Sequence, residues 1–126
     1  MRPADSGPEV RVLVWYREPE GDPAALHRAF DQVERALRRT PGLIRSELLR
    51  SVVRHGSVAV HSEWTSLGAF LAWEQGPDHR LHTAPLRPYQ DTGRDQVYDV
   101  YAVAPEGEAA VTARTDVTAG ADGSGT

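Results

Sequence analysis

One amphipathic helix, predicted over residues 21–42, constrains the fold of this 126-residue chain more than any other segment. Its large apolar residues recur at spacings of four, three and four, which places them on one stripe: Leu26, Phe30, Val33 and Leu37. Asp22 is predicted as the N-cap and Pro23 as the first helical residue, and Pro41-Gly42 ends the helix. A helix with a single apolar stripe must bury it, so the neighbouring segments should supply a sheet.

Four segments are rich in β-branched and aromatic residues and predict strands: 9–17, 43–53, 57–64 and 95–103. The second and third flank Arg54-His55-Gly56, which predicts a β-hairpin. A second helix is predicted over 66–76, with Thr65 or Ser66 as its N-cap. The order β-α-β-β-α-β predicts an α+β fold of the ferredoxin-like type, in which both helices cover one face of a four-stranded antiparallel sheet.

The other face of this sheet also needs a cover. Leu13 and Trp15 lie on the face opposite to the apolar face of their strand and would otherwise be in water. Exposed apolar sheet faces rarely stay exposed, so a second copy of the chain is the expected cover. His61 and Glu63 alternate with Trp64 along their strand and are expected to be polar contacts in this homodimer.

Composition excludes several kinds of site and partner. The chain has no cysteine, which rules out disulfides, thiol catalysis and iron–sulfur clusters. Its net charge is −4, so nucleic acid is not an expected partner. It shows no secretory leader and no apolar run long enough for a membrane span, which predicts a cytoplasmic location without membrane contact.

The polar residues 1–8 and the low-complexity residues 105–126 predict flexible ends, which leaves one folded domain over 9–104.

The segment from Trp64 to Trp73 has the pattern W-x-S-x-x-A-F-x-x-W, and "TPGLIRSELLRS" follows the first helix. Together with the aromatic-rich last strand, these features resemble the antibiotic biosynthesis monooxygenase family over about residues 10–103. The resemblance implies a dimeric α/β barrel, in which two sheets face each other and each subunit has a pocket between its sheet and its helices. Members of that family include cofactor-free oxygenases that convert aromatic polyketide phenols or anthrones to quinones, and enzymes that cleave haem.

The family's site residues can be carried over one position at a time. Trp64 matches the tryptophan that lines the pocket in the quinone-forming and haem-degrading members. The quinone-forming type has asparagine, tyrosine and arginine at three positions where this chain differs: Val60, Phe70 and Ala84. The first-strand asparagine of the haem-degrading type corresponds to Trp15-Tyr16, and its histidine ligand corresponds to Thr83 or to His82 one position away. The resemblance therefore favours no cofactor over haem.

His79 and His82 are the predicted catalytic residues. They share a helical face if residues 77–84 form a turn, and a histidine near its ordinary pKa can take a phenolic proton at neutral pH. His-x-x-His without a fixed third ligand is a weak metal motif, so no metal is expected. The predicted substrate-binding residues are aromatic or cationic: Trp64, Tyr16, Phe70, Trp73, Arg87 and Tyr89.

These observations predict a small, homodimeric, cofactor-independent monooxygenase that uses O2 to tailor an aromatic polyketide-like phenol or anthrone in secondary metabolism. Flavin is not expected, because the chain has no glycine-rich phosphate loop. A cyclase or isomerase of the same fold is an alternative, since an acid–base histidine could direct ring closure without O2. A ligand-binding module without catalysis is a second alternative, because the residues at positions 60, 70 and 84 are of the kind that a non-catalytic member would carry.

Overall fold

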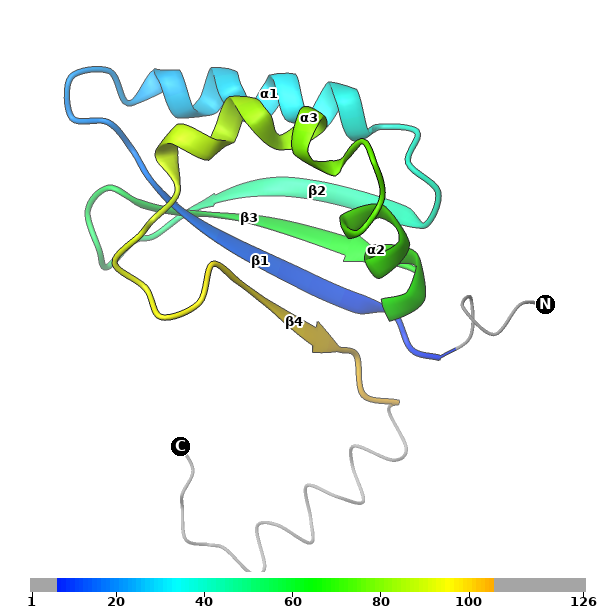
Figure 1. The fold of residues 1–126 in the computed structure, drawn as a ribbon. Coiled ribbons are helices and arrows are strands. Elements are labelled where there is room, and N and C mark those ends of the chain that lie inside the picture. The colour runs from blue at the N-terminus through cyan, green and yellow to red at the C-terminus, as the bar shows by residue number, and fades with distance from the viewer. Residues whose placement is uncertain (1–6, 106–126) are drawn as a thin grey trace, which may run out of the picture.

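The computed structural model describes residues 7–105 and confirms the predicted ferredoxin-like α+β fold (Figure 1). The elements follow one another as β1 (Val10–Arg17), α1 (Ala24–Leu37), β2 (Leu43–Arg50), β3 (Ser57–Trp64), α2 (Leu67–Glu74), α3 (His79–Thr83), the 3-10 helix η2 (Ala84–Tyr89) and β4 (Tyr98–Ala102). The sheet order is β2-β3-β1-β4, and all neighbours are antiparallel. The structure holds one chain, so the dimeric part of the fold prediction stays a prediction.

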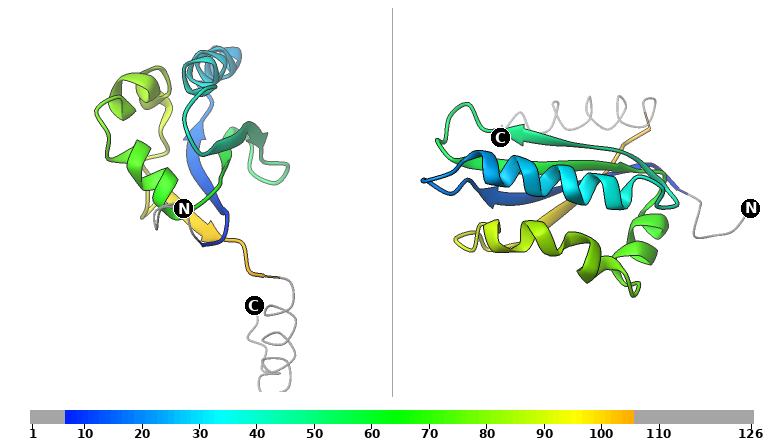
Figure 2. Two further views of the ribbon diagram at one scale, coloured as in Figure 1. Left: turned by 90° about the vertical axis from the view of Figure 1, so that its right-hand side faces the viewer. Right: turned by 90° about the horizontal axis from the view of Figure 1, so that it is seen from above.

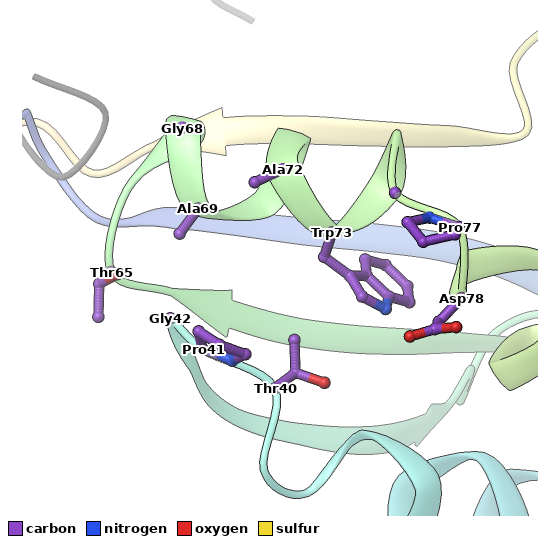
Figure 3. Close-up of a pocket in the computed structure, with 11 residues that line it drawn as sticks. Thr40, Pro41, Gly42, Thr65, Gly68, Ala69, Ala72, Trp73, Pro77 and Asp78 are labelled. Carbon is purple, nitrogen blue, oxygen red and sulfur yellow. The ribbon is translucent and has the colours of Figure 1, made fainter.

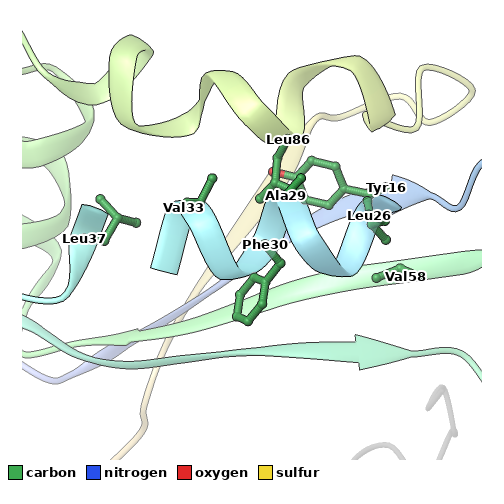
Figure 4. Close-up of a cluster of buried hydrophobic side chains, with 8 residues drawn as sticks. All are labelled: Tyr16, Leu26, Ala29, Phe30, Val33, Leu37, Val58 and Leu86. Carbon is green, nitrogen blue, oxygen red and sulfur yellow. The ribbon is translucent and has the colours of Figure 1, made fainter. Parts of the chain in front are cut away.

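All the helices lie on one side of the sheet (Figures 1 and 2). The core beneath them has two parts. The larger cluster packs α1 and η2 on the sheet (Figure 4) and consists of Tyr16, Leu26, Ala29, Phe30, Val33, Leu37, Val58 and Leu86. The smaller cluster packs α2 on the sheet and consists of Val10, Val12, Trp64 and Phe70. The predicted stripe of α1 is therefore confirmed as buried core.

The start of α1 differs from the prediction. The helix begins at Ala24, Pro23 occupies the N-cap position, and no side chain caps the first turn. Asp22 does not act as the cap because its carboxylate instead accepts a hydrogen bond from Arg28 Nη2 at 2.7 Å. The second helix follows the prediction more closely, since the Ser66 hydroxyl caps α2 by accepting from the Ala69 backbone N–H.

Two strands are shorter than predicted by three residues or more. β2 ends at Arg50 because the Ser51 hydroxyl accepts from the backbone N–H groups of Val53 and Arg54, which folds the chain into a turn. Gly56 closes this turn with a φ of 83°, as the hairpin prediction requires. β4 is confined to Tyr98–Ala102 within the predicted range 95–103.

The predicted turn over residues 77–84 forms α3, and η2 continues directly from it. The flexible ends predicted at 1–8 and 105–126 fall mainly on residues 1–6 and 106–126, which lie outside the described residues. Within the described range, no helix combines the length and the apolar character that a bilayer crossing requires.

Candidate functional site

A cavity of about 450 Å³ lies between the sheet and the helices α2, α3 and η2, and we call it the sheet–helix cavity. One part of its wall is apolar or aromatic: Val12, Val14, Phe70, Trp73, Val97 and Tyr98. The other part carries polar and charged groups: Tyr16, Glu74, His79, Arg80, Thr83, Arg87 and Gln90. A largely apolar cavity of this size with a few converging polar groups has the character of a small-molecule site.

The chain brings η2 across the end of β1 through backbone contacts. Gln90 forms an isolated antiparallel bridge with Tyr16, and the Asp91 N–H donates to the Trp15 carbonyl at 3.1 Å. Leu86 of η2 is buried beside Tyr16 in the larger core cluster (Figure 4). As a result, the polar residues of α3 and η2 lie across the cavity from those residues of β1 and β4 whose side chains point toward the helices.

The aromatic wall is built from rings that contact one another. Trp73 lies 6.2 Å from Phe70 between ring centroids, and Phe70 lies 5.9 Å from Tyr98. Trp64 supports this wall from behind, because its ring stacks on Trp73 at 5.3 Å and meets Phe70 edge-on at 5.5 Å. Trp64 itself is buried, does not line the cavity, and donates from Nε1 to Ser62 Oγ at 2.9 Å.

His79 presents a neutral imidazole to the cavity. Burial lowers its pKa from the ordinary value of 6.5, and the positive charges of Arg87 and Arg80 lower it further, while Glu74 acts in the opposite direction. The ring also meets Trp73 edge-on at a centroid distance of 4.6 Å. A histidine that is unprotonated at neutral pH can accept a proton from a ligand.

Tyr16 and Arg87 provide the other polar groups at this end of the cavity. Burial raises the pKa of Tyr16 to about 12, although Arg87 acts in the opposite direction, so the phenol stays neutral and can donate a hydrogen bond. Arg87 is held by its Nη2, which donates to Thr83 Oγ1 at 2.9 Å and to the Arg80 carbonyl at 3.1 Å.

Of the residues that the sequence singled out, the structure brings five together around the sheet–helix cavity: Tyr16, Phe70, Trp73, His79 and Arg87. Three others do not line it. Trp64 stands behind the aromatic wall, and Tyr89 packs against the larger core cluster. His82 lies on α3 outside the cavity lining, and its Nδ1 is buried without a hydrogen-bond partner among residues 7–105.

Sequence reasoning missed several lining residues, chiefly Glu74, Arg80, Thr83, Gln90 and Tyr98. Alternation along the last strand could have found Tyr98, because it places this residue on the same face as Val100, which packs against the smaller core cluster. Thr83 could have been found from its spacing of four residues after His79, which puts both side chains on one side of a helix.

A second hollow, which we call the outer groove, has a volume of about 660 Å³ (Figure 3). It lies between the turn at Thr40-Pro41-Gly42 and α2, and Trp73 separates it from the sheet–helix cavity. Gly42 has a φ of 87°, and a Cβ there would overlap the Ala69 Cβ, so only glycine fits this approach. Asp78 is the single titratable residue of its lining. The groove therefore lacks the acid–base groups that the sheet–helix cavity contains.

The chain is thus a ferredoxin-like domain with a cavity between its sheet and its helices. Residues 10–84 match the family model described as antibiotic biosynthesis monooxygenase, and the chain belongs to this family. It is 30% identical over 83 residues to Protein SchA of Streptomyces halstedii, a match that covers 66% of this chain and 22% of SchA. The chain therefore spans about a fifth of the length of that relative.

Solved structures show the same fold. The cofactor-independent oxygenase SnoaB from Streptomyces nogalater superimposes with a TM-score of 0.63 at 22% identity, covering 79% of this chain and 96% of SnoaB. A heme-degrading protein from Mycobacterium tuberculosis superimposes with a TM-score of 0.59 at 23% identity, covering 79% of this chain and 96% of that protein. Because members of one fold perform different reactions, the activity has to be argued from the site.

Proposed function

We propose that this protein is a cofactor-independent monooxygenase that oxidises an aromatic polyketide-like phenol or anthrone with O2 in secondary metabolism. The observation that carries the proposal is the convergence of His79, Tyr16 and Arg87 on a cavity with an aromatic wall. The family membership and the fold shared with SnoaB, which is described as a cofactor-independent oxygenase, support it.

The chemistry requires a base more than a cofactor. In an anthrone, His79 would accept the proton that leaves the ring system, and the resulting electron-rich anion would transfer electrons to O2. One oxygen atom of O2 becomes the new carbonyl, and the other leaves as water with the two hydrogens of the oxidised carbon. Phe70 and Trp73 would hold the flat ring system while the carbanion carbon meets O2.

Oxygen uptake with 1,8-dihydroxy-9-anthrone tests the proposal. We expect the protein to consume one O2 per anthrone in an oxygen electrode, faster than autoxidation in a blank without protein. The acid limb of kcat/KM should have its midpoint below pH 6.5, because burial lowers the pKa of His79 and the histidine loses its function as a base only when it becomes protonated. Ring closure or isomerisation without O2 uptake would instead support the cyclase alternative, and binding without turnover would support a binding module.

We also propose that the protein acts as a homodimer through the sheet face that no helix covers. Leu13 and Trp15 of β1 lie there, with Arg94 placed 4.5 Å over the Trp15 ring. The polar groups on this face are paired within the chain, since His61 contacts Glu47 at 3.0 Å and Glu63 lies 3.7 Å from Arg45. Burying paired charges beneath a second copy has a lower desolvation free energy than burying unpaired ones.

Sedimentation velocity tests the dimer. We expect a species of twice the 13.8 kDa chain mass at micromolar concentration, and Leu13→Asp should shift it to the monomer because the new carboxylate would be buried without a partner. Leu67→Asp is the matched control, because Leu67 is exposed at the start of α2 on the helix side of the sheet. A wild-type monomer, or a Leu13→Asp dimer as stable as wild type, would contradict this interface.

A further inference from the structure

The charged side chains that line the sheet–helix cavity are unbalanced. They comprise one carboxylate, that of Glu74, and two guanidinium groups, those of Arg80 and Arg87. His79 does not change this balance near pH 7, because its pKa is lowered. The lining residues of the cavity therefore carry a net positive charge, and the low-dielectric walls concentrate the resulting field.

Arg87 is the most constrained of these charges. It is half-buried, and both of its hydrogen bonds run from Nη2 to neutral acceptors, Thr83 Oγ1 and the Arg80 carbonyl. Among residues 7–105 no carboxylate forms an ion pair with it, whereas Arg28, Arg38 and Arg45, which do not line this cavity, each pair with a carboxylate. A positioned guanidinium without a counter-ion, at the wall of a cavity, is suited to an anionic oxygen.

Tyr16 offers a second group to the same oxygen. Its side chain is buried, lies close enough to Arg87 for the two to interact electrostatically, and reaches the cavity from the opposite wall. Its hydroxyl makes no hydrogen bond to any residue within 7–105. A neutral phenol and a guanidinium together can donate to one oxyanion, in the manner of an oxyanion hole.

We propose that the sheet–helix cavity binds its aromatic ligand as an oxyanion, with the ionised phenol or enol oxygen held by Arg87 and by the hydroxyl of Tyr16. This inference rests on the proposed function and deepens it, because it names the ionised hydroxyarene as the bound form. It also separates two roles. Arg87 stabilises the anion, whereas His79 only carries the proton away.

The assignment of the stabilising role to Arg87 follows from proton affinities. A histidine whose pKa lies below 6.5 can relay a phenolic proton to solvent but cannot hold it at neutral pH. A ligand whose own pKa lies above the ambient pH is therefore mainly ionised in the cavity only if positive charge stabilises the anion itself. Titratable or charged groups face the ligand space from every element around it: Tyr16 from β1, Tyr98 from β4, Glu74 from α2, His79 and Arg80 from α3, and Arg87 from η2.

Titration of alizarin, 1,2-dihydroxyanthraquinone, tests this inference without turnover. The dye is already a quinone, and its absorption spectrum shifts when a hydroxyl ionises. At saturating protein, we expect the apparent pKa of the bound dye to lie at least about one unit below that of the free dye, which is a tenfold rise in its acid dissociation constant. Arg87→Gln should abolish most of this shift, and Arg87→Lys should retain part of it because the charge remains.

Arg35→Gln is the matched control. Arg35 is exposed on α1 and does not line the cavity, so this variant makes the same change in net charge and should keep the full shift. A bound dye whose pKa is unchanged or raised would overturn the inference, as would a full shift in Arg87→Gln. Failure of the dye to bind would overturn it too, because alizarin has the aromatic surface and the ionisable oxygen that the inference requires.

The two proposals can fail separately. If the wild-type protein lowers the pKa of alizarin but consumes no O2 with the anthrone, the oxygenase proposal is contradicted and the oxyanion-site proposal is supported. A protein that consumes O2 with the anthrone, yet leaves the pKa of alizarin unchanged, would support the oxygenase and overturn the oxyanion site.

Discussion

His79→Gln is expected to lower kcat/KM for anthrone oxidation by about 100-fold or more, because general base catalysis by a positioned side chain typically contributes factors of this size. Glutamine has a similar length and is uncharged, so it keeps the cavity filled but cannot accept the proton. The acid limb of the pH profile should disappear at the same time. The remaining rate should rise with pH, since hydroxide would then be the base. Initial rates of O2 uptake between pH 5 and 9 measure both effects.

The two histidines of α3 discriminate between the readings that the sequence left open. His79 lines the sheet–helix cavity and His82 does not, so His82→Gln should keep kcat/KM within about threefold of wild type in protein that remains folded. His27→Gln is a matched control, because His27 is exposed on α1. A loss in His82→Gln that equals the loss in His79→Gln, with unchanged thermal stability, would show that the base has been assigned to the wrong histidine.

Trp64→Ala is expected to lower the free energy of unfolding by about 3–5 kcal/mol, the usual cost of truncating a large buried aromatic side chain. Trp64 is 1% exposed, stacks on Trp73, meets Phe70 edge-on and donates to Ser62. The truncation would remove all these contacts and open a void behind the aromatic wall. Single domains have about 5–15 kcal/mol of stability, so the loss is a large fraction of the total. Urea denaturation followed by far-UV circular dichroism measures it.

Two further variants separate the contributions to this loss. One isolates the hydrogen bond of Trp64 from the packing of its ring, and the other compares a buried tryptophan with one on the sheet face that no helix covers. Trp64→Phe keeps an aromatic ring in the stack but loses the N–H donor to Ser62, and should cost about 1–2 kcal/mol. Trp15→Ala removes the same side chain from the uncovered sheet face, where Trp15 is half-buried. If that face forms the dimer, the change that Trp15→Ala causes in the free energy of unfolding should depend on protein concentration. The change caused by Trp64→Ala should not. Equal effects of the two alanine variants in dilute protein would contradict the burial argument.

Much of the fold could be predicted because its signals are local. The stripe of α1, the glycine of the hairpin turn and the serine cap of α2 each act within a few residues, where backbone geometry and side-chain period decide the outcome. The errors are also local. Asp22 bonds Arg28 instead of capping α1, and the Ser51 side chain ends β2 three residues early. Competing side-chain hydrogen bonds of this kind cannot be ranked from residue types alone.

The site was harder to predict because its members come from distant parts of the chain. Tyr16 and Gln90 meet through a bridge between β1 and the segment after η2, and no periodicity in the sequence records this pairing. The spacing of His79 and His82 is compatible with one helical face, yet only the packing of α3 shows that the cavity takes up His79 and Thr83 and excludes His82. Trp64 carried the family resemblance, but the Trp73 stack stands between it and the cavity.

By itself, the sequence determined the order of the four strands and of α1 and α2, the apolar stripe of α1, the apolar face of β1, the absence of cysteine chemistry and the resemblance to the family to which the chain belongs. These properties follow from composition and from the spacing of apolar residues, which repeat about every two residues in strands and about every 3.6 residues in helices. Only the tertiary structure decided which histidine faces the cavity and that Arg87 and Tyr16 stand beside it. Such neighbours are selected by long-range packing, in which a small rotation of α3 or a shift of η2 would bring different side chains to the same place.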